Sequence, residues 1–372
     1  MTELLTIGEA SVWASRYLKK EVTTSNISYL IQYGKVTKYG KNGNTSVNKN
    51  DLIAYYKSFN GRREAHWREK LGDDLNWALS FDHVKEKDTT KHIHRLHPYK
   101  GKFIPQLVEY FLDDHTDTFK EAVSFKKGDI VLDPFSGSGT TMVQANELGI
   151  HAIGIDISAF NVLIANVKVG KVDFDDLKNE IKNITAALKD FISHNNNAQF
   201  ENELVAELQV FNKNYFPSPD YKIKVQQKNI NEKEYAQKQE KICAQTFNTL
   251  REKYNLTLTQ DNARNFLEKW YLTSVRDEID FTFEHLKRVE NPITKRILTI
   301  ILSRTMRSCR ATTHADLATL KEPITQTYYC RKHGKICKPL FSIFSWWERY
   351  SQDTVKRLYE FDTLRSNTFQ TC

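Results

Sequence analysis

The alternation of apolar and polar positions is clearest between residues 129 and 158. Residues 130–132 form a short apolar run that an Asp-Pro pair stops, which predicts a buried parallel strand. A loop with two glycines follows at 136–139, and apolar positions within 142–148 predict a helix that a glycine ends. Residues 151–156 predict a second strand that finishes on a carboxylate. The pattern indicates one βαβ unit with a glycine loop at its first turn.

This unit is suited to a ligand that contains a ribose. The glycine loop lets backbone N–H groups at the helix N-terminus approach the ligand, and an acid after the second strand can hold both ribose hydroxyls. A phosphate-binding P-loop needs Gly-Lys-Ser/Thr after the loop, whereas Thr140-Thr141 offers no lysine. A dinucleotide site needs a third small residue where Met142 stands. The pattern therefore disfavours both a nucleoside triphosphate and a dinucleotide.

The first 58 residues have the pattern of a small separate module. Apolar positions within 7–18 and 27–33 have helical spacing, and a Thr-Ser-Asn cap precedes the second stretch. Residues 35–47 predict a hairpin around a Gly-Lys-Asn-Gly-Asn turn, and 49–59 a closing helix. The module carries eight Lys/Arg against four Asp/Glu. Two helices and a basic wing favour docking on DNA, and a small bundle with merely solvated charges is the alternative.

Beyond residue 171 the apolar positions follow a helical period. Within 177–192 they recur every three or four residues, and 265–309 fits two further helices. Residues 224–242 are rich in Lys, Gln and Glu, which is typical of an exposed helix or a mobile linker. Two strands are evident in the whole chain, with one or two more at best. Residues 172–372 are therefore predicted to be mainly helical.

The composition indicates the kind of partner and the cellular compartment of the protein. The chain has 372 residues, a formal net charge of +8 and 40% hydrophobic residues, which is ordinary for a globular protein of two or three domains and favours a polyanionic partner. Its five cysteines suggest no disulfide framework, and no apolar run approaches the roughly 18 residues of a membrane helix. We expect a protein of the reducing cytoplasm without a membrane anchor.

Three strings resemble a known family. LDPFSGSGTT at 132–141 and GIDIS at 154–158 resemble motifs I and II of the S-adenosylmethionine (SAM) dependent DNA methyltransferases that methylate exocyclic amino groups. HPYKGKFIPQLVEYFL at 97–112 resembles motif X of the same enzymes. The resemblance implies SAM as the cofactor. It also implies the cofactor-binding residues Lys102, Phe103, Asp133, Pro134, Phe135, Ser136, Gly137, Ser138, Gly139, Thr140 and Asp156.

Within this set the resemblance implies different roles. Lys102 and Phe103 would lie near the methionine end of SAM, and Asp133 would face its amino-acid part. Phe135 and the glycine loop would shape the pocket, and Asp156 would hold the ribose.

The N-terminal module resembles the MerR-like or excisionase-like helix-turn-helix. By that resemblance, double-stranded DNA would be contacted from the start of the second helix and from the wing. The residues concerned are Ser25, Asn26, Ser28, Lys35, Lys38 and Lys41.

Two groups of histidine and cysteine could suggest a metal. His92, His94 and His97 lie close together, but neither carboxylate nor cysteine joins them at ligand spacing, which predicts neutral solvated histidines. Cys330, His333 and Cys337 could supply three zinc ligands, with Cys309 or His314 as the fourth. The C-x6-C spacing is looser than that of zinc ribbons, so plain thiols in a basic aromatic loop are the favoured interpretation and no metal is predicted.

The catalytic loop of the family is missing. Methyl transfer to a base amino group uses an Asp/Ser/Asn-Pro-Pro-Tyr/Phe/Trp loop in these enzymes, whereas none of the eight prolines here are adjacent. The nearest string, Ser218-Pro219-Asp220-Tyr221, is more simply an ordinary Pro-Asp turn, so the catalytic residues stay unknown. Two strands also cannot complete the parallel sheet of the family. We therefore expect a second methyltransferase subunit, or further chain, to carry the loop.

The sequence as a whole predicts an α/β protein with a partial Rossmann-like SAM-dependent methyltransferase fold. Its predicted parts are a helix-turn-helix module (1–58), a linker (59–90), a SAM-binding core (91–171) and a mainly helical insertion or target-recognition region (172–372). The predicted function is methylation of a specific DNA sequence in a restriction-modification system, at cytosine N4 rather than adenine N6. The alternatives are a non-enzymatic DNA-binding regulator with a relic methyltransferase unit and an RNA methyltransferase.

Overall fold

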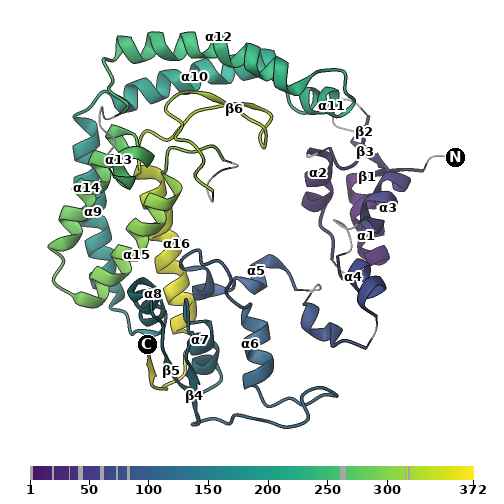
Figure 1. Ribbon diagram of the computed structural model, residues 1–372, viewed down its shortest axis with the longest axis vertical. Helices are drawn as coiled ribbons and strands as arrows, with labels where there is room; N and C mark the ends of the chain where they lie inside the picture. Colours follow the sequence, from purple (N-terminus) through teal and green to yellow (C-terminus); the bar gives the residue numbers. More distant parts are fainter. Residues whose placement is uncertain are drawn as a thin grey trace. The chain divides into compact units, whose positions relative to one another are not determined.

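The computed structural model describes residues 3–18, 21–32, 34–40, 45–58, 63–72, 74–81, 84–259, 265–314, 316 and 319–372. The chain forms two compact units. The first consists of residues 1–85 and 212–238, and the second of 86–211 and 239–372. The described elements combine many helices with three small sheets, so the prediction of a mixed α/β protein is confirmed (Figure 1).

The first unit begins with a compact N-terminal module. Its elements are β1 (Leu4–Thr6), α1 (Ile7–Leu18), α2 (Thr24–Gln32), β2 (Lys38–Tyr39), β3 (Ser46–Asn48) and α3 (Lys49–Lys57). The three strands form an antiparallel sheet in the order β1-β3-β2. Ala10 and Ala14 of α1 pack with Ile27 and Leu30 of α2 in one apolar core, because the apolar positions of both helices recur on one face. The two helices, hairpin and closing helix appear in the predicted order, with β1 added.

The range predicted as a linker contains regular structure. It holds α4 (Arg63–Leu71), the 3₁₀ helix η1 (Trp77–Ser80) and α5 (Glu86–Thr89). The indole Nε1 of Trp77 donates a hydrogen bond of 2.9 Å to Gly72 O. Lys85 pairs with Glu21 of the N-terminal module. The first compact unit accordingly extends to residue 85 rather than stopping near 58.

The second unit holds a parallel sheet of three strands. β4 (Ile130–Asp133) pairs with β5 (His151–Gly154), and the connecting helix α7 (Thr140–Glu147) packs against β5, which is the predicted βαβ unit. On its other side β5 pairs in parallel with β8 (Gln370–Thr371), so the order is β4-β5-β8. Figure 1 shows the C-terminus beside β5. The third strand therefore comes from more than 200 residues later in the sequence.

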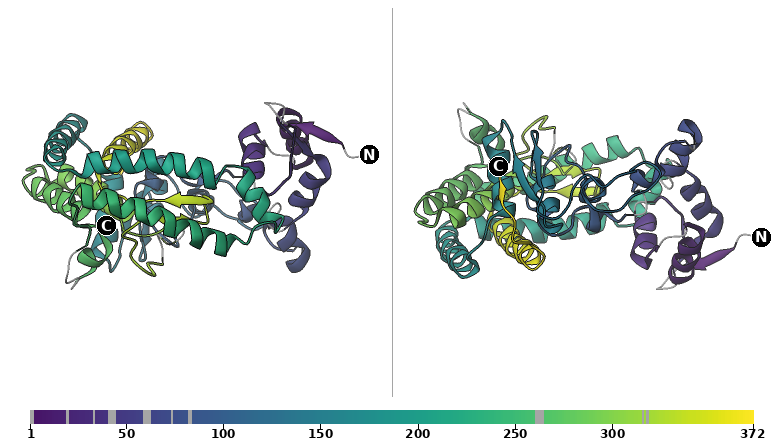
Figure 2. Two further views of the ribbon diagram at one scale, coloured as in Figure 1. Left: turned by 90° about the horizontal axis from the view of Figure 1, so that it is seen from above. Right: turned by 90° about the horizontal axis from the view of Figure 1, so that it is seen from below.

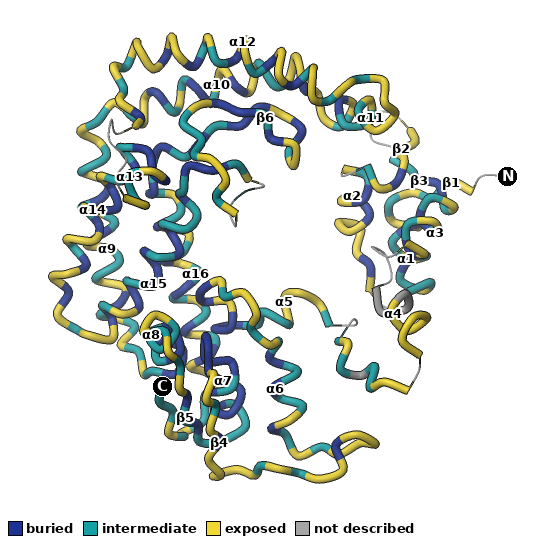
Figure 3. Tube along the Cα trace, in the orientation of Figure 1, coloured by how far each residue is buried: buried dark blue, intermediate teal, exposed yellow. Residues whose placement is uncertain are grey.

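One face of β4 is open. Val131 is buried, whereas Ile130 and Leu132, which alternate to the opposite face, are 62% and 58% exposed. In Figure 3, α7 is mostly buried while β4 shows this alternation. In the described part of the chain β4 pairs only with β5, so its outer edge is open as well. Parallel sheets are normally covered on both faces, which makes this apolar surface unusual.

The rest of the second unit is mainly helical. Its helices are η2 (His92–Arg95), α6 (Pro105–Leu112), α8 (Ala159–Val169), α9 (Phe174–Ser193), α10 (Asn197–Tyr215), α12 (Glu232–Lys253), α13 (Phe266–Trp270), α14 (Thr273–Lys287), α15 (Pro292–Ser308) and α16 (Phe344–Asp362), of which α10 and α12 run on into the first unit. Helices α9, α14, α15 and α16 pack together around the buried Trp347, whose Nε1 donates to Thr185 Oγ1 at 2.9 Å. Helices α10 and α12 run side by side, with Phe200 against Phe247 (Figure 2).

Ser218 and Pro219 form a turn that leads from α10 into α11 (Asp220–Gln226), and Asp220 and Tyr221 are the first two residues of that helix. The element directly before the string is the helix α10 and not a strand. The Tyr221 ring is buried among Phe216 and Tyr235, so it presents no face on which a base could stack. This arrangement supports an ordinary turn. Among the described helices, none combines the length and apolar character needed to cross a membrane.

Candidate functional site

A cleft of about 490 Å³ lies where β4 gives way to α7. Of the eleven residues predicted to bind cofactor, nine line it: Lys102, Phe103, Asp133, Pro134, Phe135, Ser136, Gly137, Ser138 and Thr140. Its other wall is α6, through Leu107 and Phe111. The motif X and motif I strings, which are separated by 19 residues in the sequence, therefore share one cleft. A larger cleft of about 1240 Å³ between α9 and α16 contains none of the predicted residues.

The glycine loop has the backbone that the sequence pattern requires. Gly137 and Gly139 have φ values of +49° and +76°, in the left-handed region that favours glycine. A Cβ on Gly139 would lie 2.9 Å from Cβ and 3.0 Å from Cα of Ala165 in α8, so the loop runs directly over that helix. Gly139 is the N-cap of α7, and the loop thus delivers a buried helix N-terminus to the cleft.

Asp156 lies beside the loop but does not line the cleft. Its Oδ2 accepts the N–H of Gly137 at 2.9 Å, and its Oδ1 accepts from Ser158 N at 2.8 Å and Asn161 Nδ2 at 2.9 Å. The hydrogen bond from Ser158 N, followed by that from Asn161, lowers the pKa of Asp156, so the carboxylate stays ionised. Three of its roughly four acceptor positions are used, which leaves Oδ2 able to accept one more hydrogen bond.

The cleft residues differ in exposure. Phe135 at the tip of the loop is 87% exposed, and Phe103 is 65% exposed. Lys102 is partly buried and donates from Nζ to His94 O at 2.6 Å, and burial lowers the pKa of its ammonium group. Asp133 Oδ1 accepts the N–H of Phe135 at 3.0 Å, which fixes the start of the loop. Phe103 and Phe135 are thus exposed at the mouth of the cleft, whereas Lys102 and Asp133 are held in place by hydrogen bonds to the backbone.

Several residues that support this loop were missed by the sequence analysis. Lys168 of α8 is fully buried, and its Nζ donates to Ser138 O from beneath the loop; burial lowers its pKa to about 7. The Tyr99 ring would meet a Cβ on Gly137 at 3.0 Å. Cys372, after β8, lies 3.2 Å from Ser136 Oγ through its Sγ. Only Lys168 left a signal in the sequence, as a single lysine inside the apolar run VLIANVKV of α8.

The prediction of solvated histidines is wrong. His92, His94 and His97 are all buried, because η2, which carries the first two, packs against α16 and α7, and His97 after it packs against α15. His94 Nε2 contacts Gln144 Oε1 of α7 at 2.9 Å, and burial holds the pKa of His94 well below its ordinary value. His92 Nε2 lies 2.8 Å from Glu147 Oε1. His92 and His94 thus join η2 to α7 of the βαβ unit, and His97, the first residue of motif X, contacts Ser303 of α15.

The residues predicted to contact DNA lie on the surface of the N-terminal module. Ser25, Asn26 and Ser28 are exposed residues of α2, in which Ile27 and Leu30 are buried, and Lys35 and Lys38 are exposed near the hairpin. Asn26 Oδ1 also accepts from Thr23 N and thereby caps the helix. Lys41 lies outside the described residues.

The structure brings together four of the five residues that the sequence offers as zinc ligands. Cys330, His333 and Cys337 lie near His314, with one ligand atom of each within 4.8 Å of the others. Cys309 is buried and does not belong to this group. Of the two candidates for the fourth position, the fold selects His314.

Comparison with known proteins agrees with the motifs. Residues 16–167 match the DNA methylase family of N6/N4 methyltransferases. The chain is 43% identical over 371 residues to the type II methyltransferase M.MjaII of Methanocaldococcus jannaschii, covering 99% of this chain and 68% of that relative. It is 28% identical over 145 residues to the type II methyltransferase M.MvaI of Kocuria varians, covering 38% of this chain and 30% of the relative. No solved structure matches the chain.

The match to M.MjaII covers almost the whole chain, and its extent shows the family. An identity of 43% that extends over nearly all of this chain is too long to reflect the cofactor motifs alone. The cleft carries the motif residues, and the family to which they point uses SAM. The chain therefore belongs to the amino-methylating N6/N4 DNA methyltransferases of restriction-modification systems.

Proposed function

We propose that this chain is the cofactor-binding and DNA-docking part of a cytoplasmic enzyme that transfers a methyl group from SAM to an exocyclic amino group of DNA, cytosine N4 in preference to adenine N6. The observation that carries the proposal is the cleft at the carboxyl end of β4, in which motif X and motif I residues meet. Ligands of open parallel sheets bind at this end of the strands. SAM is not a nucleoside triphosphate, which agrees with the absence of a P-loop lysine.

Each part of the cleft has a role in this proposal. The Asp133 carboxylate in the cleft accepts a hydrogen bond from the amino group of SAM, and the Asp156 carboxylate, which lies beside the cleft next to Gly137, accepts from the ribose hydroxyls. Phe103 and Phe135 supply apolar contact at the mouth. Lys168 holds the Ser138 carbonyl and so keeps the glycine loop in place while SAM enters. When bound, SAM supplies an electrophilic methyl group on a sulfonium. This chain's residues bind and orient it.

We further propose that the catalytic loop comes from polypeptide outside these 372 residues. The exposed Ile130 and the edge of β4 that no described strand pairs with support this, since an apolar residue at an open edge calls for a cover; Leu132 on the same face lines the cofactor cleft. The sequence has no Pro-Pro pair, and M.MjaII is longer than the part matched here. A second chain or further length of the same chain would supply both the cover and the loop.

Replacing Asp156 by Ala is expected to weaken SAM binding by about tenfold to a hundredfold, because hydrogen bonds to a charged group contribute roughly 1.5–3 kcal/mol. Titration calorimetry with SAM measures the effect. Asp129→Ala is the matched control, since Asp129 is an acid at the opposite end of β4 whose Oδ2 accepts from Lys126 N. Equal affinity of the wild type and Asp156→Ala would remove Asp156 from the site.

The N-terminal module is proposed to dock on double-stranded DNA. The exposed residues Ser25, Asn26 and Ser28 of α2 would face base edges, and Lys35 and Lys38 would contact phosphates. The support is the polar exposed face of α2 and the basic excess of the module.

Replacing Lys35 and Lys38 together by Ala is expected to make the negative slope of log affinity against log salt shallower by about two, roughly one for each lost phosphate contact. Fluorescence anisotropy with duplex DNA over a salt series measures it. Lys57→Ala is the control, since Lys57 is an exposed lysine of the same module at the end of α3. A slope that does not differ between the double variant and the control would refute the phosphate contacts.

A further inference from the structure

The hairpin of the second unit places two thiols on one face. β6 (Tyr328–Cys330) pairs antiparallel with β7 (Lys335–Cys337), with Tyr328 opposite Cys337 and Cys330 opposite Lys335. Side chains two residues apart lie on the same face of a strand, so Cys330 and Cys337 lie diagonally on the face that carries Tyr328. Cys330 and Cys337 are buried. The C-x6-C spacing is thus the product of a four-residue connection between two short strands.

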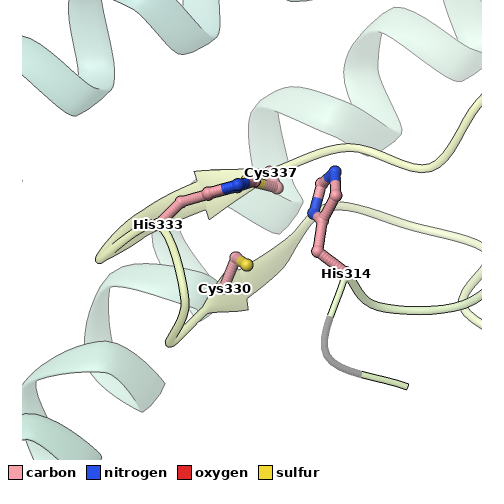
Figure 4. A group of neighbouring side chains, drawn as sticks. All are labelled: His314, Cys330, His333 and Cys337. Carbon is pink, nitrogen blue, oxygen red and sulfur yellow. The ribbon is translucent and has the colours of Figure 1, made fainter. Parts of the chain in front are cut away.

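Two histidines close on these thiols from different segments. His333 stands in the turn of the hairpin, and its Nδ1 lies 3.4 Å from Cys337 Sγ. His314 comes from the segment after α15, and its ring centroid is 4.4 Å from that of His333. The Tyr328 hydroxyl contacts His314 Nδ1 at 2.8 Å and fixes the orientation of the ring. Figure 4 shows all four side chains converging between the hairpin and the segment that carries His314.

We propose that His314, Cys330, His333 and Cys337 form a structural zinc site. The four ligand atoms lie within 4.8 Å of one another. In a tetrahedral site with Zn–S of about 2.3 Å and Zn–N of about 2.0 Å, a sulfur and a nitrogen are roughly 3.5 Å apart, which matches the distance between His333 and Cys337. Two sulfur and two nitrogen donors in this geometry select zinc over Mg²⁺ or Ca²⁺, which prefer oxygen.

The protein fills all four positions, so the ion serves structure and not chemistry. It would join the segment after α15, which is tied to α13 by Ala311 N to Trp270 O at 2.7 Å, to the β6–β7 hairpin. The hairpin in turn contacts α12, because Tyr329 N donates a hydrogen bond of 2.5 Å to the Glu240 carboxylate. A two-stranded hairpin is only marginally stable by itself, so a zinc ion would stabilise the β6–β7 hairpin.

Metal analysis of the purified full chain by mass spectrometry tests the site. About one zinc per chain is expected for the wild type, and almost none for the double variant Cys330→Ser/Cys337→Ser. His314→Ala and His333→Ala should each weaken zinc retention against a competing chelator. Cys309→Ala is the matched control, since it removes a buried thiol outside the group and should retain full zinc. Equal zinc in the double serine variant and the wild type would overturn the assignment.

Cobalt substitution makes the test independent of how the variants fold. Wild-type chain stripped of metal and titrated with Co²⁺ should show the visible bands of a tetrahedral ion and a thiolate-to-metal charge-transfer band, at one equivalent. Zinc should then displace the cobalt and raise the thermal unfolding midpoint. Absence of these bands would overturn the proposal. So would a wild-type chain that is purified under reducing conditions and contains no zinc but a disulfide between Cys330 and Cys337.

Discussion

Methyl transfer to DNA is expected to be undetectable with the 372-residue chain alone and to appear when a polypeptide that carries the Pro-Pro loop is added. The reason is chemical. The loop accepts hydrogen bonds from the base amino group and stacks a ring on the flipped base, and neither contact is available in a chain without it. The string Ser218 to Tyr221 cannot replace the loop, because the Tyr221 ring is buried.

Transfer of labelled methyl from SAM to duplex DNA measures this. The chain is assayed alone, with the product of the adjacent reading frame, and with the part of M.MjaII that it does not match. Analysis of the digested DNA should find N4-methylcytosine in the active mixtures. The chain without a partner should still bind SAM, which separates a missing loop from a failed cofactor site.

The other outcomes contradict parts of the proposal in different ways. Activity of the chain alone would mean that its own residues complete the catalytic site. Failure of every mixture, together with no SAM binding, would favour a DNA-binding regulator that keeps a relic of the fold. N6-methyladenine as the product would reverse the stated preference and leave the rest intact.

Replacing Gly139 by Ala is expected to destabilise the second unit more than replacing Gly128 by Ala. Both glycines have left-handed backbones, with φ of +76° and +89°, so both variants carry a strain of about 1–2 kcal/mol. Only at Gly139 does the new methyl group meet a neighbour, the Ala165 backbone at 3.0 Å, whereas Gly128 has nothing within 4 Å. The clash should add about 1–3 kcal/mol, because backbone must move to relieve it.

Urea unfolding of the two variants measures the difference, and SAM affinity reports the position of the loop. We expect Gly128→Ala to bind SAM like the wild type and Gly139→Ala to bind at least about tenfold more weakly, which corresponds to about 1.4 kcal/mol. Equal destabilisation by the two substitutions would show that α8 yields, and that the close approach of the loop to Ala165 is not a constraint.

The βαβ unit with its glycine loop could be predicted from the sequence because its determinants are local. The strand, glycine loop and helix from Ile130 to Glu147 lie within one short stretch, and turn chemistry and apolar spacing specify them together. The N-terminal helices were found for the same reason.

The features that the sequence does not predict depend on distant neighbours. β8 is two residues long, and only its pairing with β5 makes it a strand. His92 and His94 look polar in the sequence, yet Phe361 of α16 stacks on His92 and Gln144 of α7 binds His94. The choice of His314 over Cys309 beside the hairpin is likewise made by tertiary packing.

The pairing of β8 with β5 determines when the sheet β4-β5-β8 can form during synthesis on the ribosome. Phe369 N donates to His151 Nδ1 across 218 residues of sequence, so the third strand waits until all the intervening helices have been synthesised. Closing a loop of that length is slow unless those helices fold first and bring its ends together. The glycine loop also waits, because Cys372 contacts Ser136 only after this closure. A nascent chain is therefore expected to complete this sheet, and the contact that supports the glycine loop, only after residues 370–372 have left the ribosome. A chain that stalls earlier would leave one edge of β5 unpaired and open to chaperones.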